Sequence, residues 1–179
     1  MRAQFVIPVL VSVLILGTFS FVIPPAQTLS TLYNFNILAQ PGDIIDSKTL
    51  TGIGTHSLNN KGDIVFRGDF SGGSGIFTPT SLIAGTGDVI DGKTLTFAFQ
   101  PSLNKKGDIV FVGDFSGDRG IFTPTSLIAS TGDVIGGKTL FRVDAPSMNN
   151  KGEIVFLGLF TDGTFALILA SQHVDDDDD

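Results

Sequence analysis

The side chains whose spacing comes nearest to a chemical site in this chain are carboxylates. Asp114 and Asp118 flank a Phe-Ser-Gly turn, so two carboxylates and one hydroxyl lie around a glycine. Oxygen atoms of this kind are the ligands that calcium prefers. A polar hairpin loop is the competing interpretation, because the spacing is shorter than a full calcium-loop signature and Gly73 stands at the position that matches Asp118 one repeat earlier.

A second set of carboxylates recurs at a fixed interval. Asp43, Asp88 and Asp133 each follow a glycine and are 45 residues apart. If the repeats are arranged radially, these carboxylates would face one axis and could hold a cation. Three aspartates that cap turns are the alternative interpretation. Apart from calcium at these five positions, the sequence indicates no cofactor.

The histidines do not point to catalysis. The chain has two histidines and no cysteine. His56 is matched by Pro101 and Pro146 in the other repeats, and His173 shortly precedes the acidic C-terminal run. No Ser-His-Asp or Cys-His set can be built from them, and near-identical repeats do not bring different groups to one point. We therefore predict a non-enzymatic protein with His56 on the surface.

Aromatic residues that differ between repeats could mark a binding surface. Phe97 and Phe99 stand where the first repeat has glycines, and Phe141 lies near the same place in the third. They could line a carbohydrate or protein surface, and core filling is the alternative role. Arg67 and Arg119 are expected to be exposed charges.

An internal repeat sets the elements that would position these residues. Residues 42–86 and 87–131 are identical at 33 of 45 positions, and a third, shorter copy covers residues 132–172. Alternating apolar residues and turn signals in the second copy predict strands over residues 93–99, 108–115, 120–123 and 127–129. Asn104 and Gly107 predict the first turn, because asparagine bonds its own backbone two residues on and glycine adopts a positive φ.

This pattern predicts an all-β fold of three 45-residue, four-stranded antiparallel repeats resembling β-propeller blades. The residues from Ile109 to Val112 are apolar in succession, so neighbouring sheets should cover both faces of that strand. Three units are fewer than the minimum of about four blades in a propeller, so a second chain would complete the ring and the protein is predicted to be a homo-oligomer. A β-trefoil-like threefold fold and an open stacked arc are the alternatives.

The two ends of the repeat array depart from the pattern. Residues 37–40 match the fourth strand of a repeat, so the lead-in over residues 27–41 is predicted to hold one extra strand. The third copy is shortened after Phe160 and has Leu159 where the others have Asp69 and Asp114. An altered terminal repeat of this kind could be a cap or a contact surface.

Residues 1–26 are interpreted as a targeting segment. Arg2 is followed by an almost wholly apolar run to Ile23 and then by Pro24-Pro25-Ala26, which indicates a signal peptide. An uncleaved N-terminal anchor is the alternative, and contact with a membrane is expected only in that case. Either interpretation predicts a secreted or cell-surface protein.

The charge distribution argues against nucleic acid as a partner. The net charge is -7, and five of the eighteen acidic residues form a run within residues 173–179, a tail that we expect to be disordered. The repeats contain no basic stripe that could neutralise phosphates.

A recurring box connects the repeats with a known family. Asn59-x-x-Gly62-x-x-x-Phe66 recurs as Asn104-x-x-Gly107-x-x-x-Phe111 and Asn149-x-x-Gly152-x-x-x-Phe156. It resembles the NxxGxxAF tandem repeat of secreted bacterial proteins, which are similar to extracellular HAF-repeat propeller-like proteins. Valine stands before each phenylalanine where that pattern has alanine.

This resemblance implies an exported, propeller-like module and brings no catalytic residues. We therefore expect an extracellular binding or adhesion scaffold that holds a glycan, a cation or a protein. A self-assembling structural subunit of an extracellular oligomer or filament is the second hypothesis, and an enzyme is the third.

Overall fold

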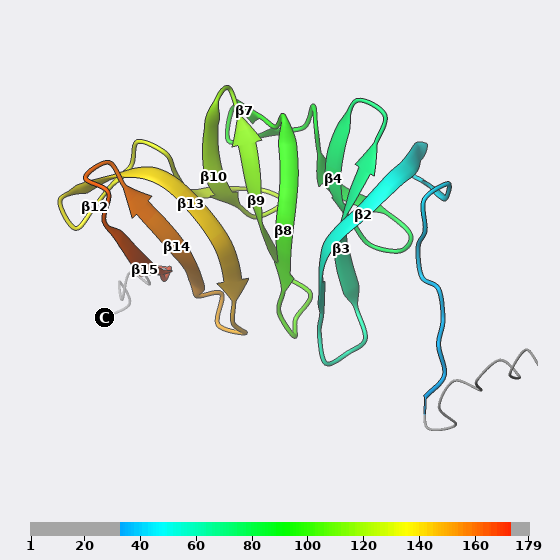
Figure 1. Cartoon of the computed structure of the whole chain (residues 1–179). Coiled ribbons are helices and arrows are strands. Elements are labelled where there is room, and N and C mark those ends of the chain that lie inside the picture. The colour runs from blue at the N-terminus through cyan, green and yellow to red at the C-terminus, as the bar shows by residue number, and fades with distance from the viewer. Residues whose placement is uncertain (1–32, 173–179) are drawn as a thin grey trace, which may run out of the picture. The chain divides into compact units, whose positions relative to one another are not determined.

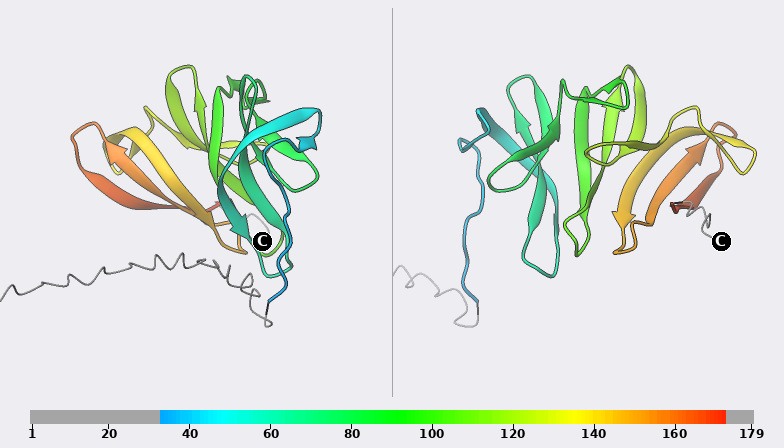
Figure 2. Two further views of the ribbon diagram at one scale, coloured as in Figure 1. Left: turned by 45° about the vertical axis from the view of Figure 1, so that its right-hand side comes forward. Right: turned by 180° about the vertical axis from the view of Figure 1, so that it is seen from behind.

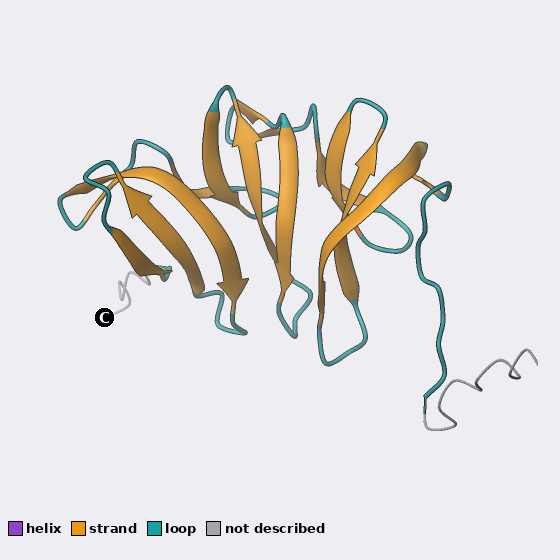
Figure 3. Cartoon of the chain, in the orientation of Figure 1, coloured by secondary structure: helices purple, strands orange, loops and turns teal. Residues whose placement is uncertain are grey.

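The computed structural model describes residues 33–172, and within this range the chain is all-β, with strands and no helix (Figures 1 and 3). The all-β prediction is therefore confirmed. All the strands belong to the unit that begins at Ile37. The predicted targeting segment, residues 1–26, and the predicted acidic tail, residues 173–179 with His173, lie outside the described residues. Among residues 33–172, none forms a helix long and apolar enough to cross a membrane.

The strands form three antiparallel sheets and one small hairpin. The first sheet contains, in order, β1 (Ile44–Ile45), β2 (Lys48–Leu58), β3 (Ile64–Phe70), β4 (Gly73–Phe77) and β5 (Leu82–Gly85). The hairpin pairs β6 (Val89–Ile90) with β7 (Lys93–Thr94). The second sheet contains β8 (Phe97–Leu103), β9 (Ile109–Phe115), β10 (Asp118–Phe122) and β11 (Leu127–Ser130). The third sheet contains β12 (Val134–Ile135), β13 (Lys138–Met148), β14 (Ile154–Phe160) and β15 (Phe165–Ala170).

The core lies between successive sheets. One cluster joins Val65, Ile76 and Ala84 of the first sheet to residues of the second that include Phe111 and Phe122. Another joins the opposite face of the second sheet, which includes Val110, Val112 and Ile121, to Leu140, Val143 and Phe156 of the third. The second sheet therefore lies between the other two, as both views in Figure 2 show.

Burial of strand β9 follows from this position. Val110, Phe111 and Val112 point to alternate faces, and all three are fully buried. Phe111 stacks on Phe122 with ring centroids 5.9 Å apart. The prediction that both faces of this strand are covered is confirmed.

The asparagine turns form as predicted, and they also connect the sheets. The side-chain Oδ1 of Asn104 accepts a hydrogen bond from the backbone N–H of Lys106 at 2.9 Å, and Gly107 has a φ of 102°. The Nδ2 atom of Asn104 donates to the carbonyl oxygen of Asn149 in the third sheet at 3.0 Å. Asn59 donates in the same way to the carbonyl oxygen of Asn104, also at 3.0 Å. Each asparagine therefore shapes its own turn and holds the next one.

The predicted strand over residues 93–99 is wrong in both extent and continuity. The pairing breaks after β7, and β8 continues past Pro101 to Leu103. The register shifts between Phe99 and Ser102, and Gln100 has a φ of 50°. At such a bulge a residue is left out of the hydrogen-bond ladder, so proline is tolerated there although it lacks an N–H.

The extra strand predicted at residues 37–40 does not form. These residues have no regular secondary structure, and Ile37 and Leu38 are exposed. The residues they match form β5, which hydrogen-bonds to β4. Within residues 33–172 no strand precedes residue 37 to take the part of β4, so the apolar pattern lacks a pairing partner there.

Candidate functional site

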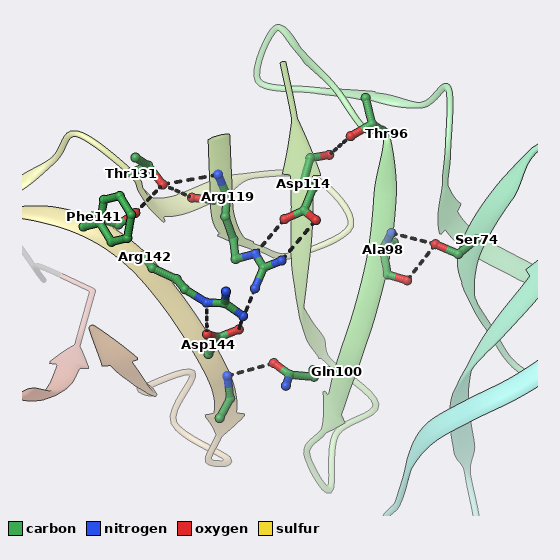
Figure 4. Close-up of polar contacts among 11 residues, drawn as sticks. Ser74, Thr96, Ala98, Gln100, Asp114, Arg119, Thr131, Phe141, Arg142 and Asp144 are labelled. Carbon is green, nitrogen blue, oxygen red and sulfur yellow. Dashed lines mark hydrogen bonds and ion pairs between the residues drawn. The ribbon is translucent and has the colours of Figure 1, made fainter. Parts of the chain in front are cut away.

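Two arginines and two aspartates meet where the second and third sheets adjoin (Figure 4). Arg119 donates from Nε to Asp114 Oδ1 at 2.6 Å and from Nη2 to Asp114 Oδ2 at 3.1 Å. Its Nη1 atom donates to Asp144 Oδ1 of the third sheet at 2.9 Å. Arg142 pairs with the other oxygen of Asp144. Arg119 thus joins the two sheets through one guanidinium group.

A tight hairpin places Arg119 beside Asp114. Phe115 pairs with Asp118 and Asp114 pairs with Arg119, so Ser116 and Gly117 alone make the turn. Both turn residues have positive φ, 46° and 89°, as a two-residue turn of type I′ requires. Directly opposite residues share a face of the sheet, and Arg119 therefore reaches Asp114 without leaving its strand.

The prediction that Arg67 and Arg119 are exposed charges is wrong. The side chain of Arg119 is only 19% exposed, and that of Arg67 is 29% exposed and pairs with Asp69. Arg119 also lies over the ring of Phe99, and Arg67 lies over Phe97, each at 4.6 Å from the ring centroid. A carboxylate and an aromatic face compensate each guanidinium for the water that it loses.

The ion pairs favour the charged form of Arg119, which arginine adopts in any case. Its hydrogen bond to Asp114 raises the pKa of the guanidinium, against the opposing effect of partial burial, and the negative charges of Asp114 and Asp144 raise it further. Arg119 is therefore a fixed positive centre that orients both carboxylates.

A hollow of about 490 Å³ opens beside this network. We call it the Arg119 hollow, and its lining residues are Thr96, Asp114, Gly117, Asp118, Arg119, Thr131, Phe141 and Arg142. The ring of Phe141 is 60% exposed, and Asp118 and Arg142 are exposed as well. A flat apolar ring thus lies in the same hollow as one guanidinium and one carboxylate that retain access to solvent.

Threonine hydroxyls hold the backbone of the hollow. Thr96 Oγ1 donates to the carbonyl oxygen of Asp114 at 3.0 Å. Thr131 Oγ1 accepts from the backbone N–H of Arg119 at 3.3 Å and lies 3.4 Å from the carbonyl oxygen of Phe141 (Figure 4). Because these hydroxyls are engaged with the backbone, their role in the structure is to fix the loops that carry the charged groups.

The five candidate calcium ligands do not gather at one place, although Asp114 and Asp118 both line the Arg119 hollow. Asp43, Asp88 and Asp133 each accept a hydrogen bond from a backbone N–H three residues earlier, at 2.7 to 2.8 Å, which is the turn-capping role. Asp114 is engaged by Arg119, and Asp118 lies across the same hairpin. Among residues 33–172, no three acidic or histidine side chains lie close enough together to hold a metal ion. Calcium binding stays a prediction.

The predicted surface and aromatic residues have mixed outcomes. His56 is exposed on β2, as predicted. Phe99 packs against the core between the second and third sheets, whereas Phe141 is exposed in the hollow. The rings of Phe97 and Phe99 are in contact, with centroids 5.6 Å apart, and of the three aromatic residues Phe141 alone lines the Arg119 hollow.

Sequence reasoning missed the residues that join the sheets. Gln100 lies on β8, and Arg142 and Asp144 lie on β13. Gln100 Oε1 accepts a hydrogen bond from the backbone N–H of Ala145 at 3.0 Å. Ser74 in the first sheet bonds both backbone groups of Ala98 in the second, at 3.0 and 3.1 Å. The sequence held a weak signal for these contacts. The residues at 100, 142 and 144 are polar, whereas the residues at the matching positions of the other repeats are apolar or small.

A second hollow, of about 630 Å³, lies between the second and third sheets near the asparagine turns. Its lining includes Lys106, Pro124, Met148, Lys151 and Gln172.

Comparison of the chain with models of known protein families and with curated proteins found no match. The site's own geometry is thus the basis for a functional proposal.

Proposed function

We propose that the chain is an exported, non-enzymatic β-repeat module that binds an uncharged carbohydrate in the Arg119 hollow. The observation that carries this proposal is the exposed ring of Phe141 beside Arg142 and Asp118. A sugar ring presents an apolar face and a rim of hydroxyl groups, so it suits an aromatic ring flanked by a donor and an acceptor. The lining contains two arginines and two aspartates, and this balance favours an uncharged ligand over an anionic one.

A propeller-type arrangement of 45-residue blades is part of the proposal. It is supported by the separate cores between successive sheets, because a β-trefoil would gather its three units around one common core. It is also supported by equivalent asparagine hydrogen bonds that each span 45 residues. In this arrangement the loops that carry Asp118 and Phe141 are displayed on a rigid scaffold, as suits a binding site.

Export is the third part of the proposal, and the apolar segment within residues 1–26 supports it. The test is N-terminal sequencing of the protein recovered from a fractionated host. A mature chain that begins close to Gln27 outside the cytoplasm is expected. A chain that begins at Met1 in the cytosolic fraction would contradict export.

Carbohydrate binding is tested with the full chain on an array of neutral and acidic oligosaccharides. Wild type is expected to retain neutral oligosaccharides, and Phe141→Ala and Arg142→Ala are expected to lose them. Phe35→Ala is the matched control, because Phe35 is 65% exposed, against 60% for Phe141, and does not line the hollow. No retention by wild type, or equal retention by Phe141→Ala, would reject the proposed site.

A further inference from the structure

The third sheet has an exposed apolar face. Direct cross-strand pairs place Val155 with Leu169, Leu157 with Leu167, and Leu159 with Phe165 on that face. We call these six residues the open face of the third sheet. Leu157, Phe165, Leu167 and Leu169 are all exposed. Contiguous apolar surface of this kind is typical of an interaction site.

The same face of the second sheet is buried. Ile121 pairs with Val112 as Leu167 pairs with Leu157, and residues 112 and 157 are one repeat apart. Ile121 is 0% exposed because it packs against the third sheet, whereas Leu167 is 76% exposed. The open face is thus the face on which a further sheet would pack.

On the first sheet, strand β2 exposes apolar residues whose counterparts in the second sheet are buried. Leu58 and Leu103 are the same residue type one repeat apart, but Leu58 is 64% exposed and Leu103 is 9% exposed. Ile53 is 42% exposed, whereas its counterpart in the second sheet, Ala98, is fully buried against the first sheet. Strand β2 therefore presents the face that β8 and β13 bury against a preceding sheet.

We propose that the open face of the third sheet binds strand β2 of a second copy of this chain. Within the chain, the first sheet packs against β8 of the second in this way, and the second sheet packs against β13 of the third. The proposed contact repeats this packing between two copies. A second copy supplies the missing neighbour at both ends. The contact is head to tail, because the two surfaces are different.

Hydrogen-bonding groups at the two ends extend the internal pattern. Asn59 donates to Asn104 and Asn104 donates to Asn149, so Asn149 of one copy is placed to donate to the carbonyl oxygen of Asn59 in the next. Ser74 contacts Ala98 across the first internal contact. By register, Phe165 is the counterpart of Ser74, and Ile53 is the counterpart of Ala98. Phe165 should therefore meet Ile53 of the second copy.

Two copies joined in this way would place six sheets in succession, which is within the range of roughly four to eight blades in a propeller. Closure into a ring would bury the open face of the third sheet and strand β2 in both copies. The contact itself depends neither on the carbohydrate proposed above nor on propeller closure, so failure of that ligand would leave it intact.

The first test measures the mass of the full chain by light scattering after size exclusion, across a wide range of concentration. Wild type is expected to be a dimer or a larger particle. Leu167→Glu and Leu58→Lys are each expected to reduce the mass to that of one chain. Val89→Glu is the control, because Val89 is 64% exposed and lies in the β6–β7 hairpin, outside both proposed surfaces. A wild-type monomer at all concentrations, or a particle that both variants leave unchanged, would overturn the proposal.

Mixing the two variants tests the head-to-tail geometry. Each variant retains the surface that the other has lost, so an equimolar mixture is expected to recover a species of twice the monomer mass. An isologous contact between two open faces would not recover in this mixture, and that outcome would overturn the proposal.

Cross-linking locates the contact without disrupting it. The chain has no cysteine, so single substitutions give a clean readout. Phe165→Cys mixed with Ile53→Cys is expected to form a disulfide-linked pair under mild oxidation, whereas Val89→Cys mixed with Ile53→Cys is not. Linkage of Phe165→Cys to itself as efficiently as to Ile53→Cys would indicate pairing between two β15 strands and would overturn the proposal.

Discussion

The outward faces of the second and third sheets occupy equivalent positions and have opposite characters. The second sheet has an Arg119–Asp114 ion pair among its buried apolar residues, and the third has Phe165 and Leu159 at the matching register on an exposed face. The face with charges is thus covered and the face without them is open. Burial in this protein follows from the presence of a neighbouring sheet, because composition alone would assign the two faces the other way.

The largest effect expected from this difference is at Phe111. This side chain is fully buried and stacked on Phe122. Phe111→Ala should lower the free energy of unfolding by about 3 to 5 kcal/mol, through lost transfer energy and a cavity. Chemical denaturation measures this loss.

Leu167→Ala is the matched change on the open face. In the Leu58→Lys background, which the proposed contact predicts to be monomeric, it should change the unfolding free energy by less than about 0.5 kcal/mol, because the side chain is 76% exposed within its own chain. Comparable losses for Phe111→Ala and Leu167→Ala in that background would show that the chain itself covers the open face.

The next effect compares two asparagines of the same box. Asn104 is buried, and its side chain joins its own turn to the third sheet, whereas Asn149 is exposed. Asn104→Ala should cost about 1 to 3 kcal/mol, since it removes the part-buried hydrogen bonds to its own turn and to the carbonyl oxygen of Asn149. Asn149→Ala should cost less in the monomer, as measured by thermal and chemical unfolding. Equal losses would show that the turn alone, and not the contact between sheets, sets the value of this residue.

A smaller effect is expected from the ion pairs. Arg119→Met should cost about 1 kcal/mol, because it removes a guanidinium shared by two partly exposed carboxylates. Arg67→Met should cost less, since Arg67 pairs with Asp69 alone. The loss at Arg119 should shrink as salt is added, because salt screens exposed charges. A loss that is independent of salt would assign the role of Arg119 to packing over Phe99 and not to charge.

The turns and central strands could be predicted from the sequence because their causes are local. Asn104 and Gly107 determine the turn within a stretch of four residues. The unbroken apolar run on β9 indicates that both faces of the strand are buried. Burial of Arg119 could not be predicted in the same way, because it depends on Asp144 in another sheet. The strand predicted at residues 37–40 was wrong for a related reason, because residues with a strand-like pattern form a strand only where a neighbouring strand can pair with them.

The smallest effect expected lies in the shortened hairpin of the third sheet. Lys138 Nζ donates to Asp162 Oδ2 at 2.9 Å and to Thr164 Oγ1 at 2.8 Å, and both Thr164 donors bond Asp162. Lys138 also lies over the ring of Phe160, as its counterpart Lys93 lies over the ring of Phe115, so the hydrogen bonds to Asp162 and Thr164 add to a contact that both repeats have. Hydrogen bonds from Thr164 and then Lys138 lower the pKa of Asp162 well below its ordinary 3.8.

Because the folded state has the lower pKa, ionised Asp162 stabilises the fold above the ordinary value, and this contribution is lost as the pH falls toward the folded pKa. Asp162→Asn should therefore lower the melting temperature slightly at neutral pH and lose this difference in strong acid. Thr164→Val, which removes only one donor, should raise the Asp162 pKa measured by side-chain NMR titration. A difference between wild type and Asp162→Asn that persists unchanged into strong acid would assign the effect to the geometry of the hairpin and not to the charge that distinguishes it from the second sheet.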